Sequence, residues 1–324
     1  MPVACNYPLR FEPIFRQYLW GGRRLGTMLG KPIGQGDDFA ESWEIVDHGA
    51  DQSVVRAGPL AGNSLGQLVR EQSAALFGRH APQQQFPLLM KLLDCNRTLS
   101  VQVHPNDEQA AQLDPPDLGK TEAWVVLAAD PGSKIYAGLK PGVTQSSLAA
   151  AITAGSLEDC LHQFEPQAGD CVFIPAGTVH ALGAGLVIAE IQQASDTTFR
   201  LFDFNRVDAS GKPRPLHVEQ SLATIDYHRG PVGAQPSAVI APGRERLVEC
   251  DKFVLDRVTL SEPMQIGGDD RFHLLAVVDG AITIAGDAVG GSLALGGTTL
   301  LPAAAGAVEI KPNGNATVLD ICLP

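Results

Sequence analysis

Apolar and alternating runs, punctuated by glycine and proline, predict a chain built mainly from β-strands. In the first two-thirds the strand patterns cover residues 42–48, 86–94, 99–104, 122–129, 170–176, 186–193 and 199–204. Three stretches with helical periodicity interrupt them, at residues 63–78, 144–164 and 216–226. The second of these is expected to form two short helices divided at Gly155.

The pattern changes after Asp226. Residues 227–246 are rich in glycine, proline and alanine, which predicts a linker or a long crossover. From Leu247 onward, short strands separated by glycine-containing turns are typical of a small β-sandwich or jelly roll. We therefore expect two β-rich modules, residues 1–235 with the helical additions and residues 236–324. The second has only one histidine, His273, so we expect the chemistry in the first.

The strand Ser100–His104 has an unusual polar side, because its alternate positions are Ser100, Gln102 and His104. Alternate residues of a strand share a face, so an amide and an imidazole can enter one cavity. Further on, "GDCVFIPAGTVHALGAG" (169–185) carries a strand into a Pro-Ala-Gly turn and then His180. This segment is similar to the second conserved motif of the cupin superfamily.

The cupin similarity implies that His180 lies inside a β-barrel and binds a divalent metal. The first cupin motif supplies two ligands at alternate positions of one strand, followed by a carboxylate, and Gln102, His104 and Glu122 match that arrangement. Two imidazoles, a carboxylate and an amide oxygen form a mixed nitrogen and oxygen site without thiolates. Such a site suits Zn²⁺, Mn²⁺, Fe²⁺ or Co²⁺ and leaves room for substrate oxygens.

Composition narrows the classes of partner. The formal net charge is −12, and no basic run exists that would neutralise nucleic-acid phosphates or bind an anionic membrane. The six cysteines are scattered without a C-x-x-C pair, which argues against a disulfide framework or a zinc ribbon. Neither a signal-peptide pattern nor a run of about 20 apolar residues is present. We expect a cytoplasmic protein with no obligatory protein partner.

Over its first two-thirds the chain resembles the type I mannose-6-phosphate isomerase (phosphomannose isomerase) family in its compact bacterial form. The resemblance rests on "PLRFEPIFRQYLWGGRRL", "ESWEIVDH", "PLLMKLLDCNRTLSVQVHPND", "GKTEAWVVL", "GTVHALG" and "SDTTFRLFDFNR". It implies two cupin-like modules, the first of them catalytic. It also implies one divalent metal per chain, zinc above the others, and a sugar-phosphate substrate.

The resemblance also assigns roles to individual residues. The metal ligands implied are Gln102, His104, Glu122 and His180. Arg200 matches the arginine essential for turnover, Ser100 and Lys120 match positions near the sugar phosphate, and Lys91, Glu190 and Asp196 match other polar positions of the pocket.

The implied reaction interconverts mannose 6-phosphate and fructose 6-phosphate through an enediol(ate). A guanidinium stays protonated, so Arg200 is assigned to stabilising the enediolate. The base is then a carboxylate such as Glu190 or a solvent-derived hydroxide, and the sequence does not choose between them. Two other classes stay open: a cupin oxidoreductase that uses Fe²⁺ and O₂, and a non-catalytic sugar-phosphate sensor.

Taken singly, these residues have ordinary structural explanations. A lone histidine is more often a packed core residue than a ligand, and Arg200 would pair with Asp196 or Asp203 on the surface. Glu190 stands in an apolar run and needs a partner if it is buried. We expect the aromatic residues near the N-terminus and in the strands to be packing residues: Phe11, Phe15, Tyr18, Trp20, Trp43 and Trp124.

Overall fold

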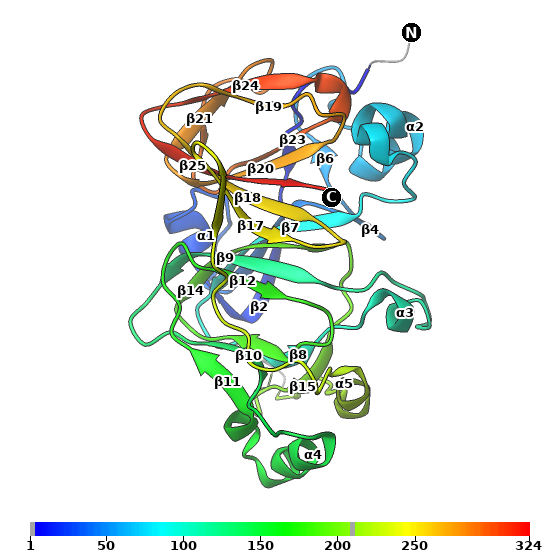
Figure 1. The fold of residues 1–324 in the computed structure, drawn as a ribbon, viewed down its shortest axis with the longest axis vertical. Helices are drawn as coiled ribbons and strands as arrows, with labels where there is room; N and C mark the ends of the chain where they lie inside the picture. Colours follow the sequence, from blue (N-terminus) through cyan, green and yellow to red (C-terminus); the bar gives the residue numbers. More distant parts are fainter. Residues whose placement is uncertain (1–3, 208–210) are drawn as a thin grey trace.

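The computed structural model describes residues 4–207 and 211–324 and consists mainly of strands arranged in stacked sheets. From bottom to top in Figure 1, the layers are a group of helices, a five-stranded sheet, two six-stranded sheets and a four-stranded sheet. The two lower sheets form an N-terminal sandwich and the two upper sheets a C-terminal sandwich. The predicted mainly-β fold with two cupin-like modules and few short helices is confirmed.

The N-terminal sandwich joins a five-stranded and a six-stranded sheet. The five-stranded sheet has the order β11 (Leu161–Phe164), β10 (Ile135–Leu139), β13 (His180–Leu182), β8 (Val101–Val103), β15 (Phe199–Phe202). The six-stranded sheet has the order β12 (Cys171–Ile174), β9 (Glu122–Ala129), β14 (Leu186–Gln193), β7 (Leu88–Cys95), β3 (Phe39–Ile45), β2 (Ile14–Gly22). Buried side chains from both sheets, among them Leu93, Ile188 and Leu182, pack together between them.

The C-terminal sandwich has the same construction. Its six-stranded sheet has the order β16 (Ala238–Ala241), β17 (Arg244–Glu249), β18 (Val254–Leu260), β25 (Ala316–Cys322), β20 (His273–Asp279), β23 (Thr298–Leu301). Its four-stranded sheet has the order β19 (Met264–Gly267), β24 (Ala307–Pro312), β21 (Ala281–Ile284), β22 (Leu293–Ala294). Val258, Val277 and Ile310 lie in the core between these two sheets.

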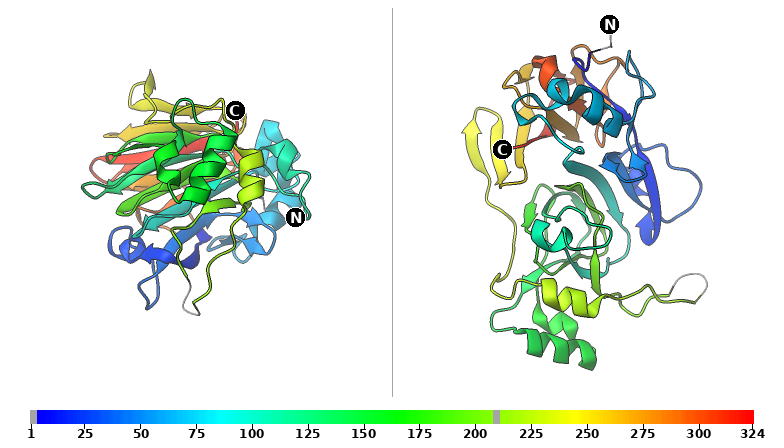
Figure 2. Two further views of the ribbon diagram at one scale, coloured as in Figure 1. Left: turned by 90° about the horizontal axis from the view of Figure 1, so that it is seen from below. Right: turned by 90° about the vertical axis from the view of Figure 1, so that its right-hand side faces the viewer.

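Short elements complete the fold around the sandwiches. The helices are α1 (Arg24–Thr27), α2 (Leu65–Phe77), α3 (Asp107–Ala110), α4 (Gln145–Ala154) and α5 (Val218–Thr224). Two small ribbons pair β1 (Phe11–Glu12) with β6 (Val54–Val55) and β4 (Asp47–His48) with β5 (Asp51–Gln52). Seen from below in Figure 2, α4 and α5 cover the five-stranded sheet, where Val101 and Val103 of β8 are buried with Leu148 of α4.

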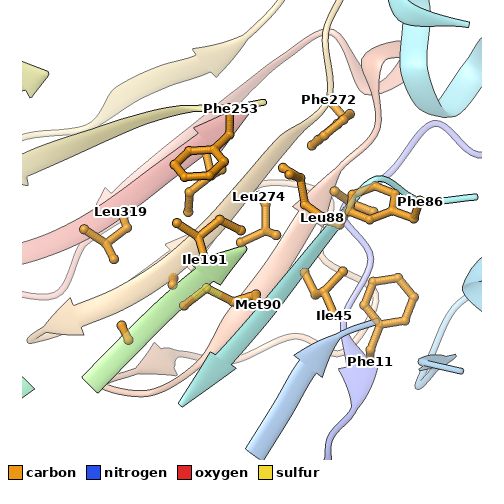
Figure 3. Packing of buried hydrophobic residues seen from close by; sticks show 14 of the residues in the cluster. Phe11, Ile45, Phe86, Leu88, Met90, Ile191, Phe253, Phe272, Leu274 and Leu319 are labelled. Atoms are coloured by element: carbon orange, nitrogen blue, oxygen red, sulfur yellow. The ribbon is translucent and has the colours of Figure 1, made fainter. Parts of the chain in front are cut away.

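The largest hydrophobic cluster lies between the two six-stranded sheets, and we call it the inter-sandwich core. Figure 3 shows Met90 and Ile191 of the N-terminal sandwich against Phe253, Leu274 and Leu319 from the C-terminal one. Every residue of β7 and of β14 is buried, because one face of their sheet covers this core and the other lines the sandwich interior. The proposed module boundary at residue 235 falls before β16, and the two modules share this core.

Several local predictions need correction. Residues 161–164, expected to be helical, form the edge strand β11, and only a 3₁₀ turn at Leu157–Cys160 follows Gly155. In the stretch 227–246, expected as a linker or long crossover, residues 227–237 contain no helix or strand, whereas residues 238–246 contribute β16 and the start of β17. Helix α2 begins after Ser64, whose hydroxyl accepts from the Gln67 N–H, and ends at Gly78 as predicted. Among the described residues, none of the helices has the length and apolarity that a membrane span requires.

Candidate active site

Strand register in the five-stranded sheet brings three predicted residues into one row. Gln102 on β8 is the cross-strand partner of His180 on β13 and, on its other side, of Arg200 on β15. Cross-strand partners project to the same face of a sheet, so the three side chains share the interior of the sandwich. Val101 and Val103 point to the opposite face and anchor β8 against the helices, as the alternation of the sequence predicts.

The six-stranded sheet presents a second row that faces the same interior. Glu190 on β14 is the partner of Lys91 on β7 and of Trp124 on β9. Glu122 lies two residues before Trp124 and therefore shares its face. Residues that alternate with these, such as Ala123 and Val125, enter the inter-sandwich core.

The two rows border a cavity of about 260 Å³ inside the N-terminal sandwich. Eight predicted residues line it, together with side chains that the sequence did not single out. The predicted set is Lys91, Ser100, Gln102, Lys120, His180, Glu190, Asp196 and Arg200. His104 and Glu122 are only 1% exposed and stand at its wall, where their polar atoms approach His180.

Three buried groups converge in the manner of a metal site. One potential ligand atom from each of His104, Glu122 and His180 lies within 4.8 Å of the others. The His180 Nε2 atom is 3.3 Å from Glu122 Oε1, and the His104 Nε2 atom is 3.6 Å from Glu122 Oε2. The amide nitrogen of Gln102 lies 3.3 Å from His180 Nε2. Rotating this amide by half a turn exchanges its nitrogen and oxygen, so that the oxygen faces the point where the other three groups converge.

Backbone carbonyls orient both imidazoles. The Nδ1 atom of His104 is 2.9 Å from the Thr197 carbonyl, and that of His180 is 2.8 Å from the Thr178 carbonyl. A proton on Nδ1 leaves the Nε2 lone pair free to face the convergence point, which is the usual arrangement in metal sites. Burial, and then the Lys120 ammonium, lower the pKa of both rings, that of His180 to about 4, so both are neutral at pH 7.

The donor set fits a divalent metal. Within the described residues, His104 Nε2 and both Glu122 carboxylate oxygens are buried without a hydrogen bond, although the Lys120 ammonium lies 3.3 Å from Glu122 Oε2. Buried polar atoms without a partner are costly, and a cation among them would satisfy all three. Burial raises the pKa of Glu122, with the nearby Lys120 opposing it, and a divalent cation would hold the group ionised. The group His104, Glu122 and His180 can therefore hold one metal ion.

A hydrogen-bond network supports this group from outside the cavity. The Asp117 carboxylate accepts from the Thr197 hydroxyl at 2.7 Å, from the Ser195 hydroxyl at 2.9 Å and from the Leu118 N–H at 2.8 Å. It also lies 3.2 Å from His48 Nε2. Because the Thr197 carbonyl faces the His104 ring, Asp117 fixes the segment that orients a candidate ligand.

Lys91 and Glu190 form a buried polar cluster on the six-stranded sheet. The Lys91 ammonium is 3.7 Å from Glu190 and 3.6 Å from Glu41, and the Trp124 N–H donates to Glu190 at 2.9 Å. Burial, and then the nearby Glu122, raise the pKa of Glu190 despite Lys91. Glu190 thus has the partners that its buried position requires, together with the raised basicity of a candidate proton acceptor.

Arg200 lies at the five-stranded side of the cavity. Its Nε donates to the Ser100 hydroxyl at 3.3 Å, and its Nη1 donates to the Pro215 carbonyl at 2.9 Å. Among the described residues its partners are therefore these two groups, and the surface pairing with Asp196 or Asp203 does not form. Arg214 also lines the cavity beside it.

Among the residues of the cavity wall that the sequence did not indicate, five have charged or aromatic side chains: Tyr18, Trp20, Glu41, Trp124 and Arg214. The assignment of the aromatic residues to packing is confirmed for Trp20 and Trp124, which are buried among apolar side chains although they also border the cavity, and it is wrong for Tyr18, which is 38% exposed. Phe11 does belong to the inter-sandwich core. The alternation of Trp124 with Glu122 on one strand was a signal that could have placed it in the cavity.

Comparisons with known proteins agree with the architecture. The profile of the family "Phosphomannose isomerase type I, catalytic domain" matches residues 9–131. Mannose-6-phosphate isomerase ManA of Bacillus subtilis is 36% identical over 275 residues, which cover 84% of this chain and 86% of the relative. A mannose-6-phosphate isomerase of Streptococcus mutans is 37% identical over 276 residues, 83% of this chain and 85% of the relative.

Solved structures extend the similarity over nearly the whole chain. The mannose 6-phosphate isomerase from Bacillus subtilis superposes with a TM-score of 0.89 and 28% identity, covering 97% of this chain and 99% of the other. A putative mannosephosphate isomerase from Archaeoglobus fulgidus shares the fold with a TM-score of 0.80 at 22% identity, over the full length of both chains.

Proposed function

Since the chain belongs to the type I phosphomannose isomerase family, we propose that it interconverts mannose 6-phosphate and fructose 6-phosphate with the help of a bound divalent metal. The observation that supports the metal requirement is the set of converging buried atoms without a hydrogen bond, His104 Nε2 and both Glu122 oxygens, for which Lys120 near Oε2 is the one cation among the described contacts. Gln102 and His180 would complete the ligand set. A zinc ion fits these nitrogen and oxygen donors, and any such cation would supply Lewis-acid polarisation of the sugar oxygens.

The reaction moves one proton between two carbons. From the aldose, the C2–H bond breaks and a C1–H bond forms, while a hydroxyl proton passes from O2 to O1. Glu190 is our candidate for the group that takes the C2 proton and returns it at C1. It is buried and its pKa is raised, which strengthens it as a base, and Lys91 and Trp124 hold its carboxylate in place.

Arg200 is proposed to stabilise the negative charge of the enediolate. Its guanidinium stays protonated at any pH of interest and enters the cavity from the row that also contains Gln102 and His180. Ser100 and Lys120 are proposed to lie near the phosphate, and Asp196 to contact the sugar. The cavity excludes bulk water from one side because Lys91, Ser100, Lys120 and Glu190 are at most 5% exposed.

A coupled assay for fructose 6-phosphate formed from mannose 6-phosphate tests the proposal. His104→Ala is expected to lose bound metal and activity together. Arg200→Ala is expected to keep the metal and lose turnover, because its side chain hydrogen-bonds Ser100 and Pro215 rather than a metal ligand. A metal-loaded wild-type protein without isomerase activity would refute the function, and normal turnover by Arg200→Ala would refute the role of the arginine.

A further inference from the structure

Three arginines and one carboxylate, that of Asp203, lie at the β15 side of the cavity. Arg214 reaches Asp203 through two hydrogen bonds, from Nε at 2.7 Å and from Nη2 at 2.6 Å. Arg206 donates to the same carboxylate and to the Thr98 carbonyl. Arg200 stands beside them with neutral partners, the Ser100 hydroxyl and the Pro215 carbonyl. These four charged side chains sum to +2.

The opposite wall of the cavity has a negative net charge. There Lys120 is 3.3 Å from Glu122, and Lys91 lies between Glu41 and Glu190. Together with Asp196, which also lines the cavity, four carboxylates face the two lysines, a sum of −2 before any metal binds. The cavity consequently has a positive side at β15 and a side at β9 and β14 where the proposed metal and base lie.

Of the two arginines that hold Asp203, only Arg214 lines the cavity. The chain after it runs along β15, where the His217 N–H donates to the Arg200 carbonyl at 2.7 Å, so Arg214 is held next to Arg200. Burial, and then the proximity of Arg214, lower the pKa of Arg200, which reflects the repulsion between the two cations. A dianion bound to Arg214 would relieve this repulsion.

We propose that Arg214 is a phosphate-binding residue, which joins Ser100 and Lys120 in receiving the phosphate of the substrate, while Arg200 beside it keeps its proposed role at the enediolate. The inference rests on the proposed function, since it names the subsite that selects a phosphorylated sugar. A phosphate monoester carries close to two negative charges at pH 7 and matches the excess of two positive charges. Asp203 orients Arg214 by its two-point contact and leaves the remaining N–H groups for the ligand.

Steady-state kinetics of the metal-loaded enzyme test this assignment. Arg214→Gln is expected to raise KM for mannose 6-phosphate by about 10- to 100-fold, the worth of a charged hydrogen bond, and to change kcat by less than about threefold. The inhibition constant of inorganic phosphate should rise by a similar factor. Arg214→Lys should recover part of the loss, because it restores the charge without the two-point contact.

Arg229→Gln provides the matched control, because it removes the same charge from a half-buried ion pair with Asp226 outside the cavity. Its KM should stay within about twofold of the wild type. The proposal is overturned if Arg214→Gln leaves KM and phosphate inhibition unchanged, or if it lowers kcat and thermal stability while KM stays constant, which is the signature of a structural role.

Failure of the proposed function is distinguishable from failure of this inference. If the wild type did not isomerise mannose 6-phosphate, calorimetry would still measure how tightly mannose 6-phosphate binds to the wild type and to Arg214→Gln. Weaker binding by the variant would support the phosphate subsite without any turnover. Equal binding by both proteins would refute it.

Discussion

Replacing Asp117 by alanine should weaken metal binding from a position outside the cavity. Besides the longer contact with His48, the carboxylate accepts three hydrogen bonds, from Ser195, Thr197 and Leu118, and Ser195 is fully buried. At about 1 kcal/mol for each hydrogen bond, their loss should lower the free energy of unfolding by about 3 kcal/mol. Because the Thr197 carbonyl orients His104, we expect metal affinity to fall by about 10- to 100-fold, as is typical for such supporting groups.

The contribution of Asp117 to the free energy of unfolding is expected to depend on pH. Burial alone would raise the pKa of Asp117, but the hydrogen bonds with His48, Thr197 and Ser195 outweigh it and lower the pKa below its usual value. The ionised carboxylate therefore stabilises the fold above the unfolded-state pKa of about 4, and this contribution is lost as pH falls through the native pKa. The stability difference between Asp117→Ala and the wild type should shrink in strong acid.

Competition with a metal chelator measures the affinity, and urea unfolding of the metal-free proteins measures the stability. Thr197→Val removes one of the three hydrogen bonds and should show a smaller effect of the same kind. Asp114→Asn removes an exposed charge from the same loop and should behave as the wild type. An Asp117→Ala protein with unchanged metal affinity would refute the argument that this network orients His104.

Two further predictions concern the C-terminal sandwich. Phe272 is fully buried, with its ring 4.9 Å from that of Phe86 across the inter-sandwich core, so Phe272→Ala should cost about 3–5 kcal/mol and shift a single urea transition. Two separated transitions would contradict a shared core. Burial lowers the pKa of His273, but the carboxylates of Asp320, at 2.7 Å, and Asp269 outweigh this effect and raise the pKa. The protonated His273 therefore stabilises the fold fully below about pH 6.5, and this contribution is lost as pH rises through the native pKa. His273→Gln should flatten this part of the curve of unfolding free energy against pH, and an unchanged slope would refute the role of the pair.

The strands that contain the candidate site residues were largely predictable. Residues 122–129 and 186–193 form β9 and β14 with the bounds that the pattern indicated. Their apolar runs are long because one face covers the inter-sandwich core, while the other directs Trp124 and Glu190 into the cavity and Glu122 towards His104 and His180. The strand β11 was missed because its four residues pair with β10 at a sheet edge, and such pairing depends on tertiary contacts rather than on local periodicity.

The cavity residues that lie within recognisable sequence motifs were predictable. Motif spacing brought Gln102, His104 and His180 together, and the register of β8 with β13 explains why. Glu41 and Arg214 carry no such signal: one lies on β3, the other follows β15, and each reaches the cavity only because its neighbours in space are far away in sequence. A charged residue in a strand or loop is ordinarily solvated, so only the fold could assign them to this wall.

Titration of the metal-stripped protein with Zn²⁺, followed by the rate of fructose 6-phosphate formation from mannose 6-phosphate, tests the central claim most directly. The convergence of His104, Glu122 and His180 on a single point predicts that activity rises linearly and levels off at one metal ion per chain. Full activity without metal, or none at one equivalent, would contradict the proposed metal-dependent isomerase.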